Sequence, residues 1–534
     1  MSERVSLLRS AGSISLATAM SRVLGLMREQ VQSYYFGAGF VTDAFLAAFR
    51  IPNLLRDLFA EGALSSAFVP TFTAIKEREG PEAAWRLANR LFTVLAVILS
   101  GVTLAIFLFA PWIMRVYAAG FTPAKLDLAV TMTRILSPFL LAVAVAAVAM
   151  GILNTYGRFF VPALAPALLN VAAILGVVML SPLFLRIGWP AGLSLAVGAM
   201  VGGILQFGIQ VPPLRTLGFR FRPDWAPRDP GLVRIAWLML PATIGQAATQ
   251  INFLVDTWLA SRYGNGPITW LSLAFRLIQL PIGLFGVAIG MANLARVSRD
   301  SATGDREGLR ANLSAALRAV ALLALPATAG LVALREPIIQ VIFEHGRFDH
   351  TSTLNTAAAL LCYAIGLYAY AVTKIQVPTF YALGDTRVPV VASTSAVAAK
   401  LAANAAFVFT LPMIGVNPFL GLALSTSVAA WTNFGILAWG LRKRAGSIAG
   451  HGVVRATLAM LAVSVATGLC CAGTHAGLTH LGPGGGVGGE IVRLGAAVAV
   501  GIATTLGGAL ALRVPEARAF TAAVSRLARR TPRA

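Results

Sequence analysis

The sequence predicts an all-α protein that crosses a membrane about 14 times, and three observations support this fold class. The chain of 534 residues is 57% hydrophobic and only 12% charged, whereas a soluble domain averages about 25% charged residues. Its mean hydropathy is +0.76. Runs of about 20 apolar residues recur along the whole chain, and each is long enough to cross the hydrocarbon core as a helix. We therefore predict a polytopic α-helical membrane protein.

Turn or charge signals separate fourteen apolar spans. They cover residues 11–36, 42–74, 87–117, 126–155, 160–186, 191–213, 232–261, 267–297, 309–343, 353–382, 388–411, 418–441, 453–478 and 489–512. The connections between them test the topology, because Lys and Arg collect in cytoplasmic loops. If the N-terminus is cytoplasmic, about 28 of the 43 Lys and Arg residues lie on the cytoplasmic side. The charge of +22 therefore indicates topology, with both termini cytoplasmic, and the scatter of basic residues argues against nucleic acid as a partner.

A weak internal repeat divides the spans into two groups of six. The triplet AFR at 48–50 returns at 274–276, TYGRFFVP at 155–162 resembles ALGDTRVP at 382–389, and GLSLAV at 192–197 resembles GLALST at 421–426. The offset is nearly constant, and an even number of spans preserves orientation. We predict one six-helix bundle over 1–225, a second over 226–445, and two additional spans with a basic tail over 446–534. Repeated bundles around a central site are a common transporter plan.

Several charged residues lie inside the predicted spans, where each costs free energy unless it faces water or a partner. In the span at 42–74, Asp43, Arg50, Asp57 and Glu61 lie within about 40° of one another on a helical projection. Arg56 points to another side, and Pro52 is expected to bend the helix between the two halves. One polar stripe on an apolar helix predicts a surface that faces a hydrated cavity.

The predominance of arginine in these spans indicates a phosphate ligand, because the planar guanidinium binds phosphate oxygens through two parallel hydrogen bonds. If Arg22, Arg28, Arg56 and Arg276 converge, their natural ligand is a polyanion such as a pyrophosphate. The alternative is that these arginines pair internally with the acids Glu29, Asp43, Asp57 and Glu61.

Asp256 and Lys400 form a separate case in the second predicted bundle. Each charge is costly alone within a membrane, so a mutual ion pair is one interpretation. The other is that each side chain simply lines the cleft. The sequence shows no metal motif, P-loop or nucleophile elbow, and we expect no metal and no cofactor.

Several segments of the sequence resemble a known family. SRVLGLMRE at 21–29 and FGAG…TDAFLAAFRIPNLLRDLFAEGALSSAFVP at 36–70 are similar to the signature of the MurJ (MviN) lipid II flippases. The likeness continues in GILNTYGRFFVPALAPALLN at 151–170, FRLIQLPIGLFGVAIG at 275–290 and FEHGRF at 343–348. It implies the fold of the multidrug/oligosaccharidyl-lipid/polysaccharide exporter superfamily. It also implies movement of undecaprenyl-pyrophosphate-linked disaccharide-pentapeptide from the cytoplasmic to the outer leaflet of the bacterial inner membrane.

The resemblance also implies a set of substrate-binding residues. The arginines of the family's central cavity match Arg22, Arg28, Arg56 and Arg276, and its cavity acids match Asp43 and Glu61. We add Arg50 and Asn53 from the same span to the expected site. The family's groove for the lipid tail matches the last two spans, at about 453–512.

Other functions remain as alternatives. A flippase for another polyprenyl-pyrophosphate oligosaccharide, such as an O-antigen unit, would need similar arginines. A drug exporter of the same superfamily is expected to present acids and aromatic residues instead. A membrane glycosyltransferase would need a catalytic acid in a sizeable outer loop, and no predicted outer connection exceeds about 15 residues. We therefore expect a transporter and not an enzyme, with lipid II and membrane lipids as partners and other cell-wall synthesis proteins as further candidates.

Overall fold

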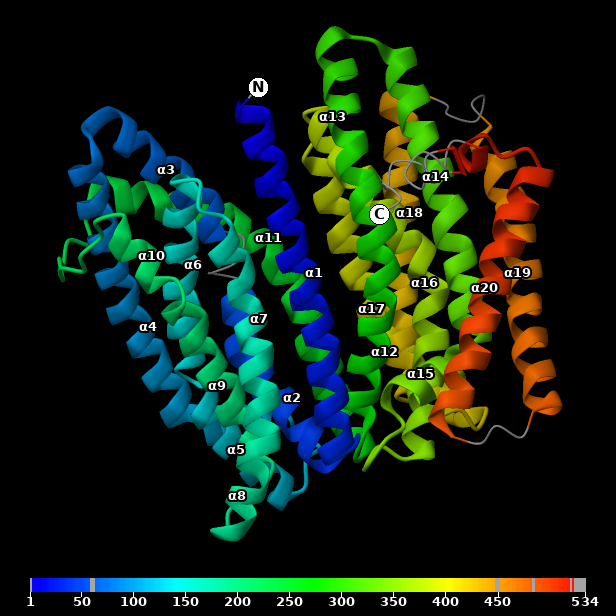
Figure 1. Cartoon of the computed structure of the whole chain (residues 1–534), viewed down its shortest axis with the longest axis horizontal. Helices are drawn as coiled ribbons and strands as arrows, with labels where there is room; N and C mark the ends of the chain where they lie inside the picture. Colours follow the sequence, from blue (N-terminus) through cyan, green and yellow to red (C-terminus); the bar gives the residue numbers. More distant parts are fainter. Residues whose placement is uncertain (1, 58–62, 447–451, 483–485, 519–520, 523–534) are drawn as a thin grey trace, which may run out of the picture. The chain divides into compact units, whose positions relative to one another are not determined.

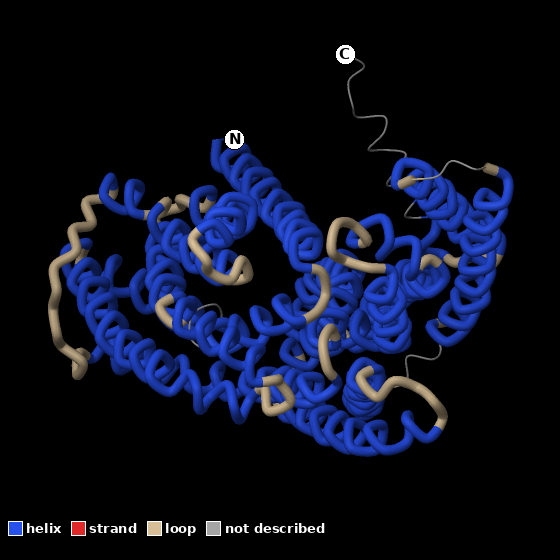
Figure 2. The backbone as a smooth tube through the Cα atoms, turned by 90° about the horizontal axis from the view of Figure 1, so that it is seen from below, coloured by secondary structure: helices blue, strands red, loops and turns tan. Residues whose placement is uncertain are grey.

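The predicted all-α class is confirmed by the computed structural model of the chain. It describes residues 2–57, 63–446, 452–482, 486–518 and 521–522, with all their side chains except those of 2–16, 63, 242 and 244–249. These residues form helices joined by short connections, and Figure 2 shows no strand among them. The order of the helices along the chain can be followed by colour in Figure 1.

Contacts divide the chain into two compact units. The first comprises residues 1–269 and 345–349, and the second comprises 270–344 and 350–534. The helix that follows the first predicted bundle packs against two earlier helices, so it belongs to the first unit by contacts. The repeat boundary at residues 225 and 226 concerns sequence similarity and stays a prediction.

The helices of the first unit follow one another along the chain through short connections. They are α1 (Ser2–Phe36), α2 (Phe40–Arg56), α3 (Ala63–Glu79), α4 (Pro81–Tyr117), α5 (Pro123–Leu136), α6 (Phe139–Thr155), α7 (Phe160–Leu175), the π-helical segment η2 (Gly176–Leu180), α8 (Ser181–Arg186), α9 (Leu193–Gly208), α10 (Val211–Thr216), α11 (Pro230–Ala260) and the 3₁₀ turn η3 (Ser261–Tyr263).

The helices of the second unit begin with α12, whose first three residues cluster with the first unit. They are α12 (Pro267–Pro281), the π-helical segment η4 (Ile282–Val287), α13 (Ala288–Thr303), α14 (Arg306–Ala333), α15 (Arg335–Phe343), α16 (His350–Ala382), α17 (Arg387–Met413), α18 (Leu420–Ala445), α19 (Val453–Leu481) and α20 (Val487–Ala511).

Eleven helical segments of the described chain are long and apolar enough to cross a membrane. Each coincides with one of the predicted spans. The other three predicted spans, at 11–36, 42–74 and 232–261, fall on α1, on α2 with α3, and on α11. These are the spans in which charged and amide side chains interrupt the apolar sequence, and the count of fourteen stays a prediction.

Aromatic side chains fill the core of the first unit where α3, α4 and α6 meet. The ring of Phe72 lies 5.3 Å from that of Phe68 and 5.9 Å from that of Trp85, and Trp85 stacks on Tyr156 at 5.5 Å. Phe68 and Phe72 are fully buried. Offset and edge-on ring pairs add stability beyond the area that they bury, so this corner fixes the three helices against one another.

In the second unit, α16 packs against α14, α13 and α18, and the last two helices form a pair. Figure 1 shows α19 and α20 side by side, and α19 also packs along α14. The Oγ1 atoms of Thr467 and Thr505 lie 3.0 Å apart between the paired helices. Arg318 of α14 forms an ion pair of 2.6 Å with Glu516, just after α20.

A glycine pair brings η4 and α13 against α16. A Cβ atom on Gly286 would lie 3.0 Å from the Cα of Ala371, and one on Gly290 would overlap the carbonyl oxygen of Lys374. Small residues four positions apart let membrane helices approach to backbone contact, where van der Waals packing is strongest. The spacing therefore determines how closely the two segments pack.

We predict that Gly290→Ala lowers the free energy of unfolding by about 1–3 kcal/mol, because the added methyl group meets backbone that cannot move aside. The measurement is the thermal unfolding midpoint of the purified protein in detergent. Gly330→Ala on α14 is the matched control, since nothing lies within 4 Å of its Cβ position and alanine favours a helix by up to about 1 kcal/mol. Equal midpoints for the two variants would contradict the prediction.

Candidate functional site

The start of α2 is ordered by a local hydrogen-bond arrangement. The Thr42 hydroxyl donates to the carbonyl oxygen of Gly37 at 2.8 Å and accepts from the backbone N–H of Gly39 at 3.0 Å. This arrangement satisfies a backbone donor that the first helical turn leaves free. It also fixes the direction of the next side chain, Asp43.

Asp43 is fully buried and forms an ion pair with Lys125 of α5 at 2.9 Å. Its Oδ2 atom also accepts from the backbone N–H of Gly266 at 2.7 Å. Its Oδ1 atom accepts from the backbone N–H of Thr269 at 2.9 Å and from the hydroxyl of Thr269 at 2.6 Å. Both carboxylate oxygens therefore have two donors each, which offsets the cost of burying the charge.

Lys125 is itself buried and reaches further partners. Its ammonium donates to the side-chain oxygen of Asn265 at 3.0 Å and lies 4.4 Å from the ring centre of Phe121. The pair thus joins the start of α2, the start of α5 and the connection between α11 and α12, all within the first unit. The sequence stripe placed Asp43 on a hydrated surface, whereas the structure encloses it in protein, because Lys125 and residues 264–269 fill that side of the helix.

Arg50 lies about two turns after Asp43 along α2, over an aromatic ring. The carbon at the centre of its guanidinium is 3.9 Å from the ring centre of Phe253 on α11. Its Nε and Nη2 atoms are buried and have no hydrogen-bond partner among the described residues. Asp57 and Asp256 lie close enough for their charges to act on Arg50. The site therefore holds a half-buried cation, two of whose donor atoms are buried and lack a partner among the described residues.

Arg56 and Asp57 form an ion pair at the end of α2. Both Nη2 and Nε of Arg56 donate to Oδ1 of Asp57, at 2.9 and 3.3 Å, and the amide of Gln250 donates to Oδ2 at 3.2 Å. This is the internal pairing that the sequence left as an alternative. Asn53 is half-buried on the same helix, and Glu61 lies outside the described residues.

The two predicted arginines of α1 differ in exposure. Arg22 is exposed, whereas Arg28 is half-buried and pairs with Glu29 at 3.4 Å. The helix itself is held by α7, where the Asn170 amide donates to the carbonyl oxygen of Ser21 at 3.1 Å. The first unit therefore offers one arginine to solvent and ties the other to an acid.

Arg276 belongs to the second unit, where it is exposed on α12. Its neighbour Phe275 packs edge-on against Tyr363 at 5.3 Å. Lys400 is buried on α17, one turn from Asn404, which accepts a hydrogen bond from the hydroxyl of Ser425. Arg276 and Lys400 belong to the second unit, whereas the other arginines and Asp256 belong to the first. Convergence of the arginines and pairing of Lys400 with Asp256 therefore both stay predictions.

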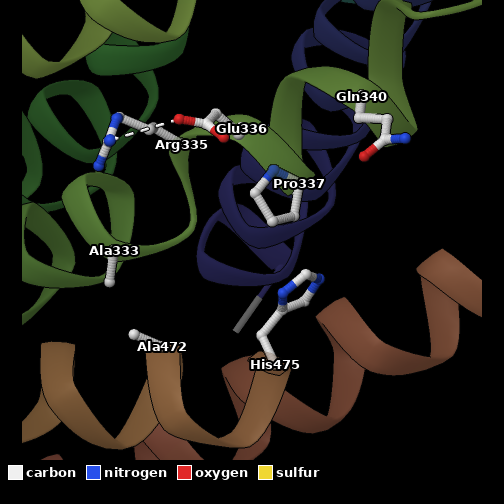
Figure 3. A pocket seen from close by; sticks show the side chains of 7 residues that line it. All are labelled: Ala333, Arg335, Glu336, Pro337, Gln340, Ala472 and His475. Atoms are coloured by element: carbon white, nitrogen blue, oxygen red, sulfur yellow. Dashed lines mark hydrogen bonds and ion pairs between the residues drawn. The ribbon is translucent and has the colours of Figure 1, made fainter. Parts of the chain in front are cut away.

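The second unit also contains a polar cavity of about 290 Å³ where α15 meets α19. Figure 3 shows its lining, with Pro337 and His475 facing each other and the Arg335 guanidinium turned toward Glu336. None of these residues was predicted as functional. Within the described part of the chain, no three His, Cys, Asp or Glu side chains are grouped as metal ligands.

The sequence reasoning missed three partners of the predicted residues. Lys125 lies in the connection between the predicted spans 87–117 and 126–155, and a single lysine there carries no signal of a buried pair. Gln250 and Phe253 contact Asp57 and Arg50. Their spacing of three residues, with the predicted Asp256 three residues later, is a helical face that could have identified them.

Comparisons with known proteins give one consistent result. A family model described as lipid II flippase MurJ matches residues 32–493. The lipid II flippase MurJ of Burkholderia cenocepacia is 39% identical over 446 residues, which cover 82% of this chain and 84% of that protein. The probable lipid II flippase MurJ of Vibrio cholerae is 36% identical over 445 residues, which cover 82% of this chain and 83% of that protein.

Solved structures agree with the sequence comparisons. A structure titled lipid II flippase MurJ, inward closed conformation, superposes with a TM-score of 0.75 at 26% identity and covers 93% of this chain and 97% of that chain. An inward-facing multidrug transporter of the MATE family superposes with a TM-score of 0.60 at 15% identity and covers 82% of this chain and 95% of that chain. The second likeness shows the fold alone.

We predict that Asp43→Ala and Lys125→Ala each lower the free energy of unfolding by about 3–5 kcal/mol, because each leaves a buried charge without its partner. The double variant is expected to cost less than the two single changes together. Thermal unfolding midpoints in detergent test both statements. Asp127→Ala is the control, because Asp127 is an exposed acid on α5, the helix of Lys125. Its free energy of unfolding is expected to change by no more than about 0.5 kcal/mol. A midpoint for Asp43→Ala equal to that of the control would contradict the structural role.

Proposed function

Because the chain belongs to the lipid II flippase MurJ family, we propose that it moves lipid II from the cytoplasmic to the outer leaflet of the bacterial inner membrane. The mechanism is alternating access, in which a central site opens first to one side and then to the other. The pyrophosphate binds the arginines, and the polyprenyl tail stays in lipid along α19 and α20. The cycle makes and breaks no covalent bond, so it needs no catalytic residue. Both chain termini are cytoplasmic.

The observation that carries this proposal is the state of Arg50. A guanidinium that is stacked on a ring, with two buried donors unused among the described residues, presents its remaining hydrogen-bonding capacity to a ligand. Phosphate oxygens accept two parallel hydrogen bonds from such a planar guanidinium, and these charge-assisted bonds are among the strongest in proteins. Buried donors without partners also cost free energy, which an arriving anion removes.

Arg56 supplies a second contact by exchanging partners. In the structure its charge is neutralised by Asp57. A pyrophosphate carries more negative charge than one carboxylate, so it competes for the guanidinium, while Asp57 keeps its hydrogen bond from Gln250. Arg22, Arg28 and Arg276 complete the pyrophosphate site, with Asn53 beside Arg56.

Asp43 and Glu61 have different parts in this proposal. Asp43 acts through Lys125 by holding the start of α2 in position, so that Arg50 and Arg56 stand at fixed places along the helix. Glu61, which matches a cavity acid of the family, is assigned the role of limiting the net positive charge of the arginines. Asp256 and Lys400 are assigned to a mutual ion pair, in which each charge offsets the cost of the other within the membrane.

The main alternative is a flippase for another polyprenyl-pyrophosphate oligosaccharide, because the arginine site recognises the shared pyrophosphate. A drug exporter is less compatible with the site, since cationic ligands need free acids and Asp57 is already paired with Arg56. Complementation separates these functions. The wild-type chain should restore growth to a bacterium depleted of its own lipid II flippase, and failure at normal expression would exclude the lipid II assignment.

In the same strain, we predict that Arg56→Ala and Arg276→Ala fail to restore growth. Each change removes a charged contact to the pyrophosphate, and water cannot replace that contact. Arg134→Ala is the control. Arg134 also lies in a predicted span, but its guanidinium contacts the ring and the carbonyl oxygen of Phe107. Neither of these contacts involves a residue of the proposed site. Membrane levels of the variants are measured by immunoblot. Growth of both site variants at the wild-type rate would rule out the pyrophosphate site.

Arg50 gives a sharper test of how the anion is held. We predict that Arg50→Leu weakens lipid II binding by about tenfold or more, since a hydrogen bond to a charged group contributes about 1.5–3 kcal/mol. Arg50→Lys keeps the charge but loses the planar fork, so it should recover only part of the affinity. Native mass spectrometry of the purified variants with added lipid II gives the bound fraction. Full affinity in Arg50→Leu would place Arg50 outside the site.

A further inference from the structure

The connection between α10 and α11 is held in a defined position along α4. The backbone N–H of Arg222 donates to the Asn89 side chain at 3.0 Å, and that of Asp224 donates to the Thr93 hydroxyl at 3.1 Å. The ring of Phe219 is buried and lies 5.4 Å from that of Phe92. We call residues 217–229 the basic strap.

Arg90 of α4 forms ion pairs with both acids of this strap. Its guanidinium forms ion pairs with Asp224, at 2.7 Å, and with Asp229. Asp229 in turn accepts hydrogen bonds from the backbone N–H groups of Gly231 and Leu232 and so caps α11. Both acids of the strap are therefore engaged with groups of the protein itself.

What the strap presents outward is basic and aromatic. Arg220, Arg222 and Arg228 are exposed, and no ion pair to a described residue is found for any of them. Phe221 is 53% exposed and Trp225 is 56% exposed. Arginine with large aromatic side chains is the composition expected at a bilayer surface, where the ring enters the headgroup region and the guanidinium binds phosphate.

The neighbouring helices determine the depth of the strap. On α4, Val97 and Ile98 are both 53% exposed and follow Arg90 by about 10 Å along the helix axis. On α11, Trp237 is 70% exposed two turns after the strap ends. Both helices thus pass from the strap into apolar, outward-facing surface, which places the strap at the level of the lipid headgroups.

We propose that the basic strap binds the headgroups of anionic phospholipids. The charge bias of the loops places it on the cytoplasmic side, where the leaflet surface is negative. An acidic protein segment would match the arginines but not the apolar surface that continues into α4 and α11. A lipid matches both, with its phosphate on the arginines and its acyl chains along Val97, Ile98 and Trp237. This site is separate from the pyrophosphate site of the proposed function.

The test compares the full-length protein with two triple variants of equal charge loss. Arg220→Gln/Arg222→Gln/Arg228→Gln changes the strap, and Arg296→Gln/Arg299→Gln/Arg306→Gln changes exposed arginines around the connection of α13 and α14. Native mass spectrometry measures the affinity of each protein for added phosphatidylglycerol and phosphatidylcholine. A third variant, Phe221→Ser/Trp225→Ser, removes the exposed rings and keeps the charges.

We expect the wild type to prefer phosphatidylglycerol and the strap variant to lose about tenfold or more of that affinity, from three arginines near the surface. The ring variant should weaken both lipids alike. Thermal unfolding without added lipid confirms that the variants are folded. An equal loss in both triple variants would overturn the proposal, because the effect would then be one of net charge. Equal affinity of the wild type for the two lipids would also overturn it.

Discussion

The ion pair between Asp43 and Lys125 is the interaction on which the first unit depends. Four donors surround one carboxylate, and they come from α5, from the turn before α12 and from the first turn of α12. A charge buried in this way is costly to separate from its partner, so the three segments keep one arrangement. Because the start of α2 is fixed in this way, the positions of Arg50 and Arg56 further along the helix are fixed as well.

Polarity within the described chain is unevenly distributed among the helices. Eleven helical segments are apolar enough to cross a bilayer without assistance. Most described charges of the predicted site lie on α1, α2 and α11, whereas Arg276 and Lys400 lie on α12 and α17, within two of the apolar segments. These polar helices pack against apolar ones such as α7, α4 and α5, which shield them from lipid. A protein that transports an anionic headgroup needs both kinds of helix, because the ligand requires cations and the bilayer excludes them.

Much of the fold could be predicted from the sequence, and the site only in part. Hydropathy located the eleven apolar segments because each helix carries its own signal. The stripe on α2 predicted neither the Phe253 ring beside Arg50 nor the surroundings of Asp43, whose partner Lys125 is 82 residues away. The pairing of Arg56 with Asp57 was foreseen only as an alternative, since adjacent charges can meet each other or a ligand. Contacts over such separations depend on packing, which helical periodicity does not encode.

The π-helical segment η4 has a consequence for every helical projection drawn through this part of the chain. A wide turn accommodates one residue more than an α-helical turn, so the faces after it are rotated by about 100° relative to those before it. Arg276 precedes η4, and Gly290 follows it. A wheel that ignores the extra residue would assign these two side chains to the wrong relative faces. The segment acts as a phase shift that lets α12 present one surface while α13 keeps its glycine against α16.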